Sequence, residues 1–296
     1  MQKNMQKKMQ KRVKPKSQFR TLIGLTFKQG YARLGGVIVL GILFIAVFGP
    51  LFAPYTFDEF VDAPNAPRSD TLMLGADYFG RDVYSRFLSG GRSIIGLSFI
   101  STVLGVGLGL LIGLFAASAK KRTDGLIMRV NDILLAFPQI VFVLLVVSGF
   151  GTSVFLIAVT VGFTHAPRTA RIIRAAAAEV MERDFIKAAI AVGEKRQRII
   201  ISELLPNVTS PLLVEFGLRM TYSIGLVAAV SFLGLGLQPP AADWGLMINE
   251  NRGSLTVQPW GVLAPIAAIA LFTIGVNFIT DSFAKVAIGI DRKGKE

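Results

Sequence analysis

The sequence contains no cysteine and only one histidine among its 296 residues. The first absence excludes disulfide bonds and cysteine-ligated metals, and a single histidine, His165, cannot build a histidine-rich metal site. Charged residues are also scarce, at 17%, where a soluble domain carries about a quarter. We therefore expect neither a metal nor a cofactor on this chain, and the apolar content has to indicate the fold.

Apolar residues make up 52% of the chain, and the mean hydropathy is +0.56. They lie in separate blocks, and a membrane-spanning helix needs about 20 predominantly apolar residues. The pattern predicts an all-α membrane protein with six transmembrane helices. The expected spans are 34–52, 94–118, 126–147, 153–163 with some of the residues that follow, 212–235 and 260–288.

The distribution of basic residues predicts the orientation. Residues 1–33 hold ten lysines and arginines, the 119–129 loop four, the 165–210 loop eight and the C-terminal end four, so 26 of 32 lie on one side. The positive-inside rule places that side, with both termini, in the cytoplasm. Topology thus explains most of the net charge of +13, and a nucleic-acid partner is not needed.

The predicted organisation follows from these spans and charges. Gly-Pro and Ala-Pro close the first span without a small-residue cleavage site, so we expect a retained anchor rather than a signal peptide. Residues 1–20 are rich in Lys and Gln, and we expect them to be disordered. The expected parts are a basic cytoplasmic tail (1–33), an anchor (34–54), an extracytoplasmic segment (55–92), a five-helix core (93–290) with a cytoplasmic loop (165–210), and a short tail (291–296).

Several features have a structural interpretation that we prefer to a functional one. Gly105, Gly109 and Gly113 recur every four residues, which is typical of close helix packing in membranes. Glu215 and Arg219 share a helix face and are expected to pair rather than to line a pathway, and the same expectation holds for Asp132 in the third span. His165 is expected to be a polar boundary residue, and two tryptophans, 244 and 260, to be interface anchors.

No enzymatic constellation is evident in the sequence. Residues 289–295 fit G-x-x-x-x-G-K, but a phosphate loop needs a Ser or Thr and a following helix, so this match is interpreted as chance. There are no carboxylates plausibly paired in one pocket, no H-E-x-x-H motif and no Ser-His-Asp set. The chain is therefore expected to be neither an enzyme nor a nucleotide-binding subunit.

The loop at 184–207 carries the most informative pattern. A short amphipathic segment with two small residues, Ala188 and Ala189, is followed by Gly193, which permits a sharp change of direction, and by a second helix that Pro206 is expected to end. Such a helix–turn–helix, held by the fourth and fifth spans, would suit docking of an external partner. An ordinary amphipathic loop on the membrane surface is the alternative.

This loop resembles the EAA loop of binding-protein-dependent ABC importer permeases, E-A-A-x3-G-x9-I-x-L-P. The matching positions are Ala188, Ala189, Gly193, Leu205 and Pro206. Lys187 stands in place of the acidic residue, and Glu203 in place of the Ile. Lys187 reverses the charge on which a salt bridge of the family would depend.

Two further stretches resemble the dipeptide/oligopeptide/nickel permeases. One is similar to L-G-T-D-x-x-G-R-D-x-x-S-R, through Gly75, Asp77, Gly80, Arg81, Asp82, Ser85 and Arg86. The other is similar to the S-F-L-G-L-G-x-Q-P-P…W-G signature of the C-type permease, through Ser231, Phe232, Gly234, Gly236, Gln238, Pro239, Pro240 and Trp244. The resemblance covers residues 20–290, and it places both stretches near the translocation mouth.

The resemblance implies a type I ABC importer permease fold in the bacterial inner membrane. The expected partners are a second homologous permease, two cytoplasmic ATPase subunits that bind ATP and Mg²⁺, and an extracytoplasmic solute-binding protein. The expected function is ATP-driven import of peptides or similar small solutes, and the solute itself stays open. An ion-coupled secondary transporter and a non-transporting scaffold for an ATPase are the competing hypotheses.

Overall fold

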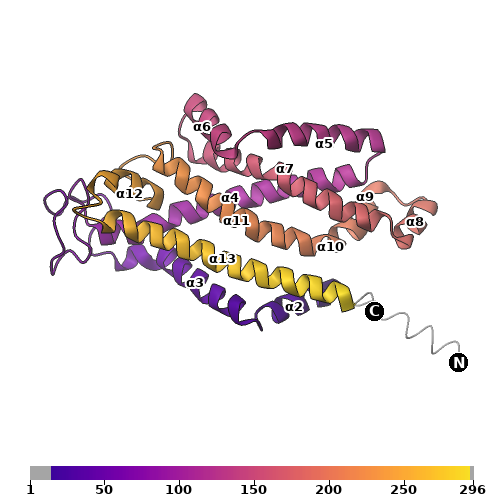
Figure 1. Ribbon diagram of the computed structural model, residues 1–296, viewed down its shortest axis with the longest axis horizontal. Helices are drawn as coiled ribbons and strands as arrows, with labels where there is room; N and C mark the ends of the chain where they lie inside the picture. Colours follow the sequence, from indigo (N-terminus) through magenta and orange to yellow (C-terminus); the bar gives the residue numbers. More distant parts are fainter. Residues whose placement is uncertain (1–14, 294–296) are drawn as a thin grey trace.

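The computed structural model describes the backbone of residues 15–293 and the side chains of residues 21–289. This part of the chain is helical and contains no β-strand, which confirms the predicted all-α class (Figure 1). The longer helices form an elongated bundle. Their bounds are α2 (Pro15–Thr26), α3 (Gly30–Phe48), α4 (Val83–Ala117), α5 (Lys121–Ala136), α6 (Gln139–Phe150), α7 (Val154–Met181), α11 (Thr209–Phe232) and α13 (Trp260–Lys293).

Shorter elements lie at the two ends of this bundle. One end carries α8 (Asp184–Ala191), α9 (Arg196–Arg198), a π-helix (Ile199–Leu204) and α10 (Leu205–Asn207), and we call it the α8 end. The opposite end carries 3₁₀ turns (Gly49–Phe52 and Arg252–Ser254), the irregular residues 53–82 and α12 (Trp244–Asn251), and we call it the α12 end. Helix α2 and the last turns of α13 lie toward the α8 end (Figure 1).

Among the described residues, four helices are long and apolar enough to cross a membrane: α3 with the turn after it, α4, α11 and α13. The α5–α6 pair makes a fifth if its two bent halves count as one span. Helix α7 has 28 residues but carries three arginines in its second half. Many large apolar side chains face outward, such as Val37 (70% exposed) and Leu111 (67%), as expected where lipid is the solvent.

The prediction of one continuous helix over 126–147 is wrong. Helices α5 and α6 meet at an angle of 81° around Phe137 and Pro138. Proline cannot donate the backbone bond that a continuing helix needs, and it biases the preceding residue toward an extended conformation. Phe137 accordingly has φ −80° and ψ 131°. The result is an elbow, with the more polar α5 on one side and the apolar α6 on the other.

Helix α4 begins eleven residues before the predicted span. Asp82 caps it by accepting bonds from the backbone N–H groups of Tyr84 and Ser85, which satisfies donors that the first turn leaves free. At the N-terminus, residues 15–26 form helix α2, where disorder was expected up to residue 20; residues 1–14 lie outside the described residues. At the C-terminus, residues 289–293, the described part of the phosphate-loop match, continue α13 as a helix.

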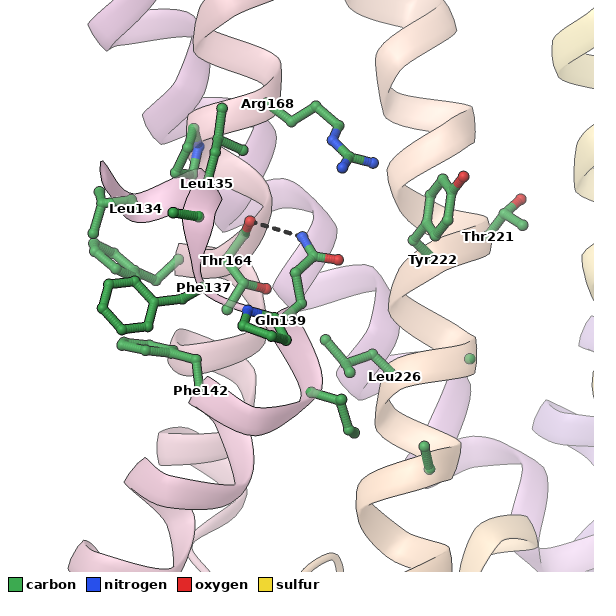
Figure 2. Close-up of a pocket in the computed structure, with 17 residues that line it drawn as sticks. Leu134, Leu135, Phe137, Gln139, Phe142, Thr164, Arg168, Thr221, Tyr222 and Leu226 are labelled. Atoms are coloured by element: carbon green, nitrogen blue, oxygen red, sulfur yellow. Dashed lines mark hydrogen bonds between the residues drawn. The ribbon is translucent and has the colours of Figure 1, made fainter. Parts of the chain in front are cut away.

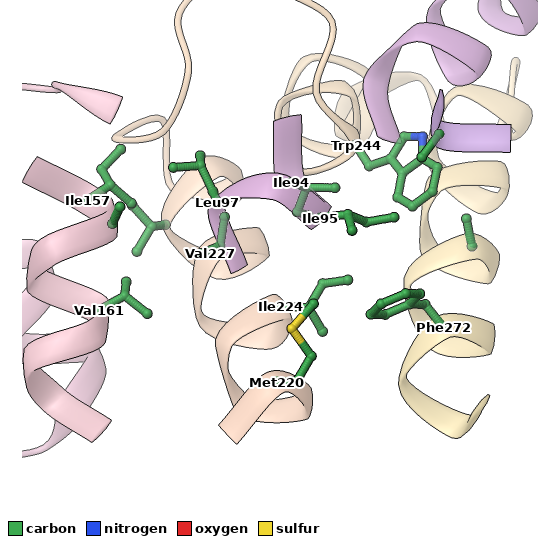
Figure 3. Close-up of a cluster of buried hydrophobic side chains, with 14 of the residues drawn as sticks. Ile94, Ile95, Leu97, Ile157, Val161, Met220, Ile224, Val227, Trp244 and Phe272 are labelled. Atoms are coloured by element: carbon green, nitrogen blue, oxygen red, sulfur yellow. The ribbon is translucent and has the colours of Figure 1, made fainter. Parts of the chain in front are cut away.

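The central core joins seven helices, α3, α4, α6, α7, α11, α12 and α13, with buried apolar side chains (Figure 3). Ile94 and Ile95 of α4 pack with Ile224 of α11, Phe272 of α13 and Trp244 of α12. Helices α4 and α7 also approach each other closely. A Cβ atom on Gly105 would lie 2.5 Å from the carbonyl oxygen of Gly162, so the glycines of α4 serve packing within one chain, as predicted.

Candidate functional site

The predicted site residues gather at both ends of the bundle, and a cavity lies between those ends. The turn after α8 has the geometry that Gly193 permits, because its φ is +79°, where side chains with a Cβ are strained. The Gly193 N–H donates to the Ile190 carbonyl and closes the turn. Pro206 does not end the second helix as predicted. It lies in the first turn of α10, where the missing N–H costs little.

The α8 loop has one anchored face and one open face. Ile186, Ile199 and Leu204 are buried against Leu114 of α4 and Ile173 of α7. The other face exposes apolar side chains of Phe185 (41%), Ile190 (51%) and Val192 (79%). Among the predicted residues, Lys187, Ala188 and Pro206 are exposed, and Ala189 and Leu205 are half-buried. The loop is thus held in place while it presents an uncovered apolar surface.

A second contact fixes the loop to helix α4. The Arg196 guanidinium donates to the hydroxyl of Ser118 (3.0 Å) and to the carbonyl of Phe115 (2.7 Å), and it lies 4.6 Å from the centre of the Phe115 ring. A cation at the C-terminal end of a helix is favoured by the helix dipole. Lys187, by contrast, makes only an exposed ion pair with Glu182 at 3.4 Å, and such pairs contribute little.

At the α12 end, four charged side chains form a buried, balanced cluster. Arg81 contacts Asp77 at 2.7 Å and Glu250 at 2.8 Å, and Arg86 contacts Glu250 at 2.9 Å and Asp77 at 3.4 Å. All four side chains are at most 6% exposed. Two cations alternate with two anions, so every charge has two opposite neighbours. We call this group the ion cluster.

The ion cluster ties together three segments that are distant in sequence. Arg86 also donates to the carbonyls of Phe57 (2.7 Å), Pro240 (3.4 Å) and Ala241 (3.3 Å). Gly75 and Gly80 form turns before α4, and Ser85 donates its hydroxyl to Asp82 in the α4 cap. The seven predicted residues at 75–86 therefore build one rigid unit with α12.

The second predicted stretch forms the connection from α11 to α12. Ser231 and Phe232 close α11, and the turn that follows contains Gly234 and Gly236. The Gln238 amide donates to the carbonyls of both glycines at 3.0 Å, just before Pro239 and Pro240.

Trp244 is not an interface anchor, contrary to the prediction. It is fully buried, stacks on Phe87 and donates to the Phe87 carbonyl at 2.9 Å. Trp260 is half-buried, with the Arg68 guanidinium 4.1 Å from its ring. The indole of Trp244 thus serves packing between α4 and α12.

Asp243 caps α12 from a buried position. Its carboxylate accepts from the N–H groups of Gly245 (3.0 Å) and Leu246 (3.1 Å) and from the hydroxyl of Ser93 (2.8 Å). Burial raises the pKa of this carboxyl above its ordinary value, and the hydrogen bonds it accepts oppose that shift.

A cavity of about 650 Å³ opens between the α5–α6 elbow, α7 and α11 (Figure 2). Its wall is mostly apolar, and Gln139 donates across it to the carbonyl of Thr164 at 2.9 Å. Nearby, Asn131 donates to the carbonyl of Pro167 at 2.9 Å. The polar residues that line the cavity are Gln139, Thr164, Arg168, Thr221 and Tyr222.

The charged residues expected within spans are paired. Glu215 and Arg219 lie 3.3 Å apart and are both 3% exposed, as predicted. Asp132 pairs with Arg171 at the surface of α5 and α7. His165, however, is no boundary residue, because its side chain is fully buried in α7 beside Gly105 of α4. The boundary interpretation was wrong because α7 continues as a helix past Pro167.

Reasoning from sequence missed Glu250, Arg196 and Arg168 as site residues. Glu250 lies in the short helix α12. The only sequence signal for it was that Arg81 and Arg86, some 160 residues earlier, had no evident acidic partner nearby. Arg196 and Arg168 were used only as basic residues that indicate the cytoplasmic side. The contacts of Arg196 with α4 were not predicted, and the place of Arg168 in the cavity depends on the elbow at Pro138.

Two known protein families match most of the chain. The family described as binding-protein-dependent transport system inner membrane component matches residues 109–287. The N-terminal TM domain of oligopeptide transport permease C matches residues 26–68. The second match includes α3, and the first includes α5, α6, α7, the α8 loop, α11 and most of α13.

Curated relatives match over most of their length. A glutathione transport system permease protein of Pectobacterium atrosepticum is 32% identical over 256 residues, which is 86% of this chain and 85% of that protein. A dipeptide transport system permease protein of Alkalihalophilus pseudofirmus is 33% identical over 259 residues, covering 86% and 84%.

Solved structures with the same fold are more distant in sequence. A methionine ABC transporter in inward-facing conformations matches with a TM-score of 0.55 and 18% identity, over 66% of this chain and 93% of that chain. An amino acid ABC transporter with histidines matches with a TM-score of 0.52 and 19% identity, over 68% and 93%.

Proposed function

Because the chain belongs to the family of binding-protein-dependent transport system inner membrane components, we propose that it forms half of a translocation pathway for peptides or similar small solutes. It is a permease subunit of an ABC importer in the bacterial inner membrane, and it is not itself an enzyme. The proposed solute class rests on relatives whose names specify dipeptide, glutathione and peptide transport.

We further propose six membrane crossings, formed by α3, α4, the α5–α6 elbow, α7, α11 and α13. The α8 end then lies in the cytoplasm with both termini, and the α12 end lies outside. Two observations support this orientation: the basic loops gather at the α8 end, and α2 and the end of α13 lie toward it (Figure 1). The proposed parts keep the boundaries 1–33, 34–54, 55–92, 93–290 and 291–296, and the first turns of α4, residues 83–92, belong to the extracytoplasmic segment.

The observation that carries the proposed mechanism is the uncovered apolar face of the α8 loop. Phe185, Ile190 and Val192 are exposed on a loop whose opposite face is buried against α4 and α7. An ATPase subunit that covers this face would move α8, and the anchored face would pass the movement to α7. A second permease of the same family and two such ATPases, which bind ATP and Mg²⁺, complete the proposed complex.

At the opposite end, the ion cluster and the α11–α12 connection form a stiff surface for a solute-binding protein. Their backbone is held by buried ion pairs and by the Arg86 bonds to three carbonyls. A rigid surface would bind the loaded binding protein at a lower entropic cost, because no loop has to become ordered in the contact.

A charge placed on the apolar face of α8 tests this proposal. In the assembled complex, Ile190→Asp is expected to lower co-purification of the ATPase subunits and uptake together, because it buries a carboxylate in the contact. Val257→Asp is the matched control for ATPase co-purification alone, since Val257 is 73% exposed at the opposite end of the bundle. Normal ATPase retention and uptake in Ile190→Asp would exclude the docking role.

A further inference from the structure

Helix α7 carries three arginines, Arg168, Arg171 and Arg174, and two of them have partners. Arg171 pairs with Asp132 and Arg174 with Asp124, both from α5. Arg168 makes no ion pair and no hydrogen bond with any side chain or backbone group that the structure describes. Arg168 is exposed, and an unpaired guanidinium halfway along a helix proposed to span the membrane is a candidate for function.

The Arg168 side chain extends from α7 toward α11 across the cavity (Figure 2). It is the only charged residue in the lining of this cavity. Gln139, Thr164, Thr221 and Tyr222 supply the other polar groups, and the rest of the wall is apolar. The cavity therefore has one cation, several neutral hydrogen-bonding groups and no anion.

The charges behind the cavity wall do not cancel this positive charge. Arg219 lies 4.9 Å from the ring of Tyr222, but Glu215 holds it at 3.3 Å. That buried pair is neutral as a unit, and Thr169 adds a bond to Glu215 at 3.3 Å. Asp132 and Asp124 are each engaged by the arginine that contacts them. The net charge facing the cavity is that of Arg168.

We propose that Arg168 binds the free carboxylate of the solute as it passes through this cavity. This inference rests on the proposed function and names the chemical feature that the pathway recognises. A guanidinium presents parallel donors that match a carboxylate, and the apolar wall strengthens their attraction. The volume of about 650 Å³ is within the range of sites that hold small ligands.

An acidic side chain of the second permease would satisfy the same guanidinium, so the experiment has to separate the two sources of carboxylate. The probes are trialanine and trialanine amide, which differ only in the terminal carboxylate. Binding is measured by equilibrium dialysis to the purified complex without ATP and without the solute-binding protein. The variants are Arg168→Gln, Arg168→Lys and, as the control on the same helix, Arg171→Gln.

We expect the wild-type complex to bind trialanine about 10- to 100-fold more tightly than its amide, as for one charged hydrogen-bonded pair. Arg168→Gln is expected to abolish this preference, Arg168→Lys to keep part of it, and Arg171→Gln to keep it in full. The proposal is overturned if the wild type binds neither probe, if it shows no preference, or if the preference survives in Arg168→Gln.

Subunit assembly provides the second readout. If Arg168→Gln lowers co-purification of the second permease and changes binding of both probes alike, Arg168 pairs with that subunit and the proposal is wrong. Failure of the proposed function gives a different result: ATP-dependent uptake of trialanine by wild-type complex with its binding protein would be absent. The binding preference is measured without ATP, so the two failures are distinguishable.

Discussion

Removal of one carboxylate from the ion cluster is the sharpest test of how the α12 end is held together. Glu250 contacts Arg81 at 2.8 Å and Arg86 at 2.9 Å, and its side chain is 6% exposed. In Glu250→Ala, two buried guanidinium groups would share Asp77 alone. The net charge of the cluster would change from zero to +1, and the remaining charged side chains are buried.

The size of this effect follows from burial. Breaking a buried ion pair by removing one partner costs about 3–5 kcal/mol, because a charge is left uncompensated. The pair of Arg171 with Asp132 is the matched contrast, since those side chains are 56% and 57% exposed. Removing an exposed partner costs about 0–1 kcal/mol. The expected fall in melting temperature is about 6–20 °C for Glu250→Ala, and no more than about 4 °C for Asp132→Ala.

The assay is the temperature at which half of the purified complex is lost from its monodisperse size-exclusion peak. Glu250→Met combined with Arg81→Met restores neutrality with apolar side chains, and we expect it to recover much of the lost stability. If Glu250→Ala is no more destabilising than Asp132→Ala, the cluster does not stabilise the α12 end and the reasoning is refuted.

Three other predictions concern single positions. Gly105→Ala is expected to cost about 1–3 kcal/mol because its Cβ would meet the Gly162 carbonyl at 2.5 Å; Gly107→Ala meets nothing within 4 Å and serves as control in the same thermal assay, where equal shifts would contradict the packing. Gly193→Val is expected to lower uptake several-fold through backbone strain of about 1–2 kcal/mol, whereas Gly193→Asn, which tolerates this φ, retains most of it; equal uptake by the two variants would contradict this. Because burial raises the pKa of Asp243, the folded state binds a proton more readily than the unfolded state, so the melting temperature of the wild type relative to Asp243→Asn is expected to fall as pH rises from the ordinary Asp range through the raised pKa. A difference that stays constant between pH 4 and 8 would exclude the effect.

The parts of the fold that could be predicted depend on local pattern. Apolar runs located α3, α4, α11 and α13, because length and hydropathy suffice for a spanning helix. The same criterion misplaced the elbow, since a run of apolar residues across Pro138 looks continuous in composition while the backbone turns by 81°. It also gave α4 too short a length, because the capping Asp82 precedes residues too polar for a span.

The functional residues divide in the same way. Gly193 was identifiable because a turn between two amphipathic segments needs a residue that adopts positive φ. Arg81 and Arg86 were identified by motif, but their partner Glu250 was not, since the cluster closes through the fold across some 160 residues. Trp244 was placed at a membrane interface because composition cannot distinguish an exposed indole from one stacked on Phe87.

The close contact between α4 and α7 has a mechanical consequence. With 28 residues, α7 is about 42 Å long, and a tilt of about 10° around one end would displace the other by about 7 Å. Glycines on the contact face leave no soft layer of side chains between the two helices to absorb such a tilt. The two helices would tilt together, so a tilt driven from α8 would move the cavity wall beside Arg168, halfway along α7, by about half of that displacement.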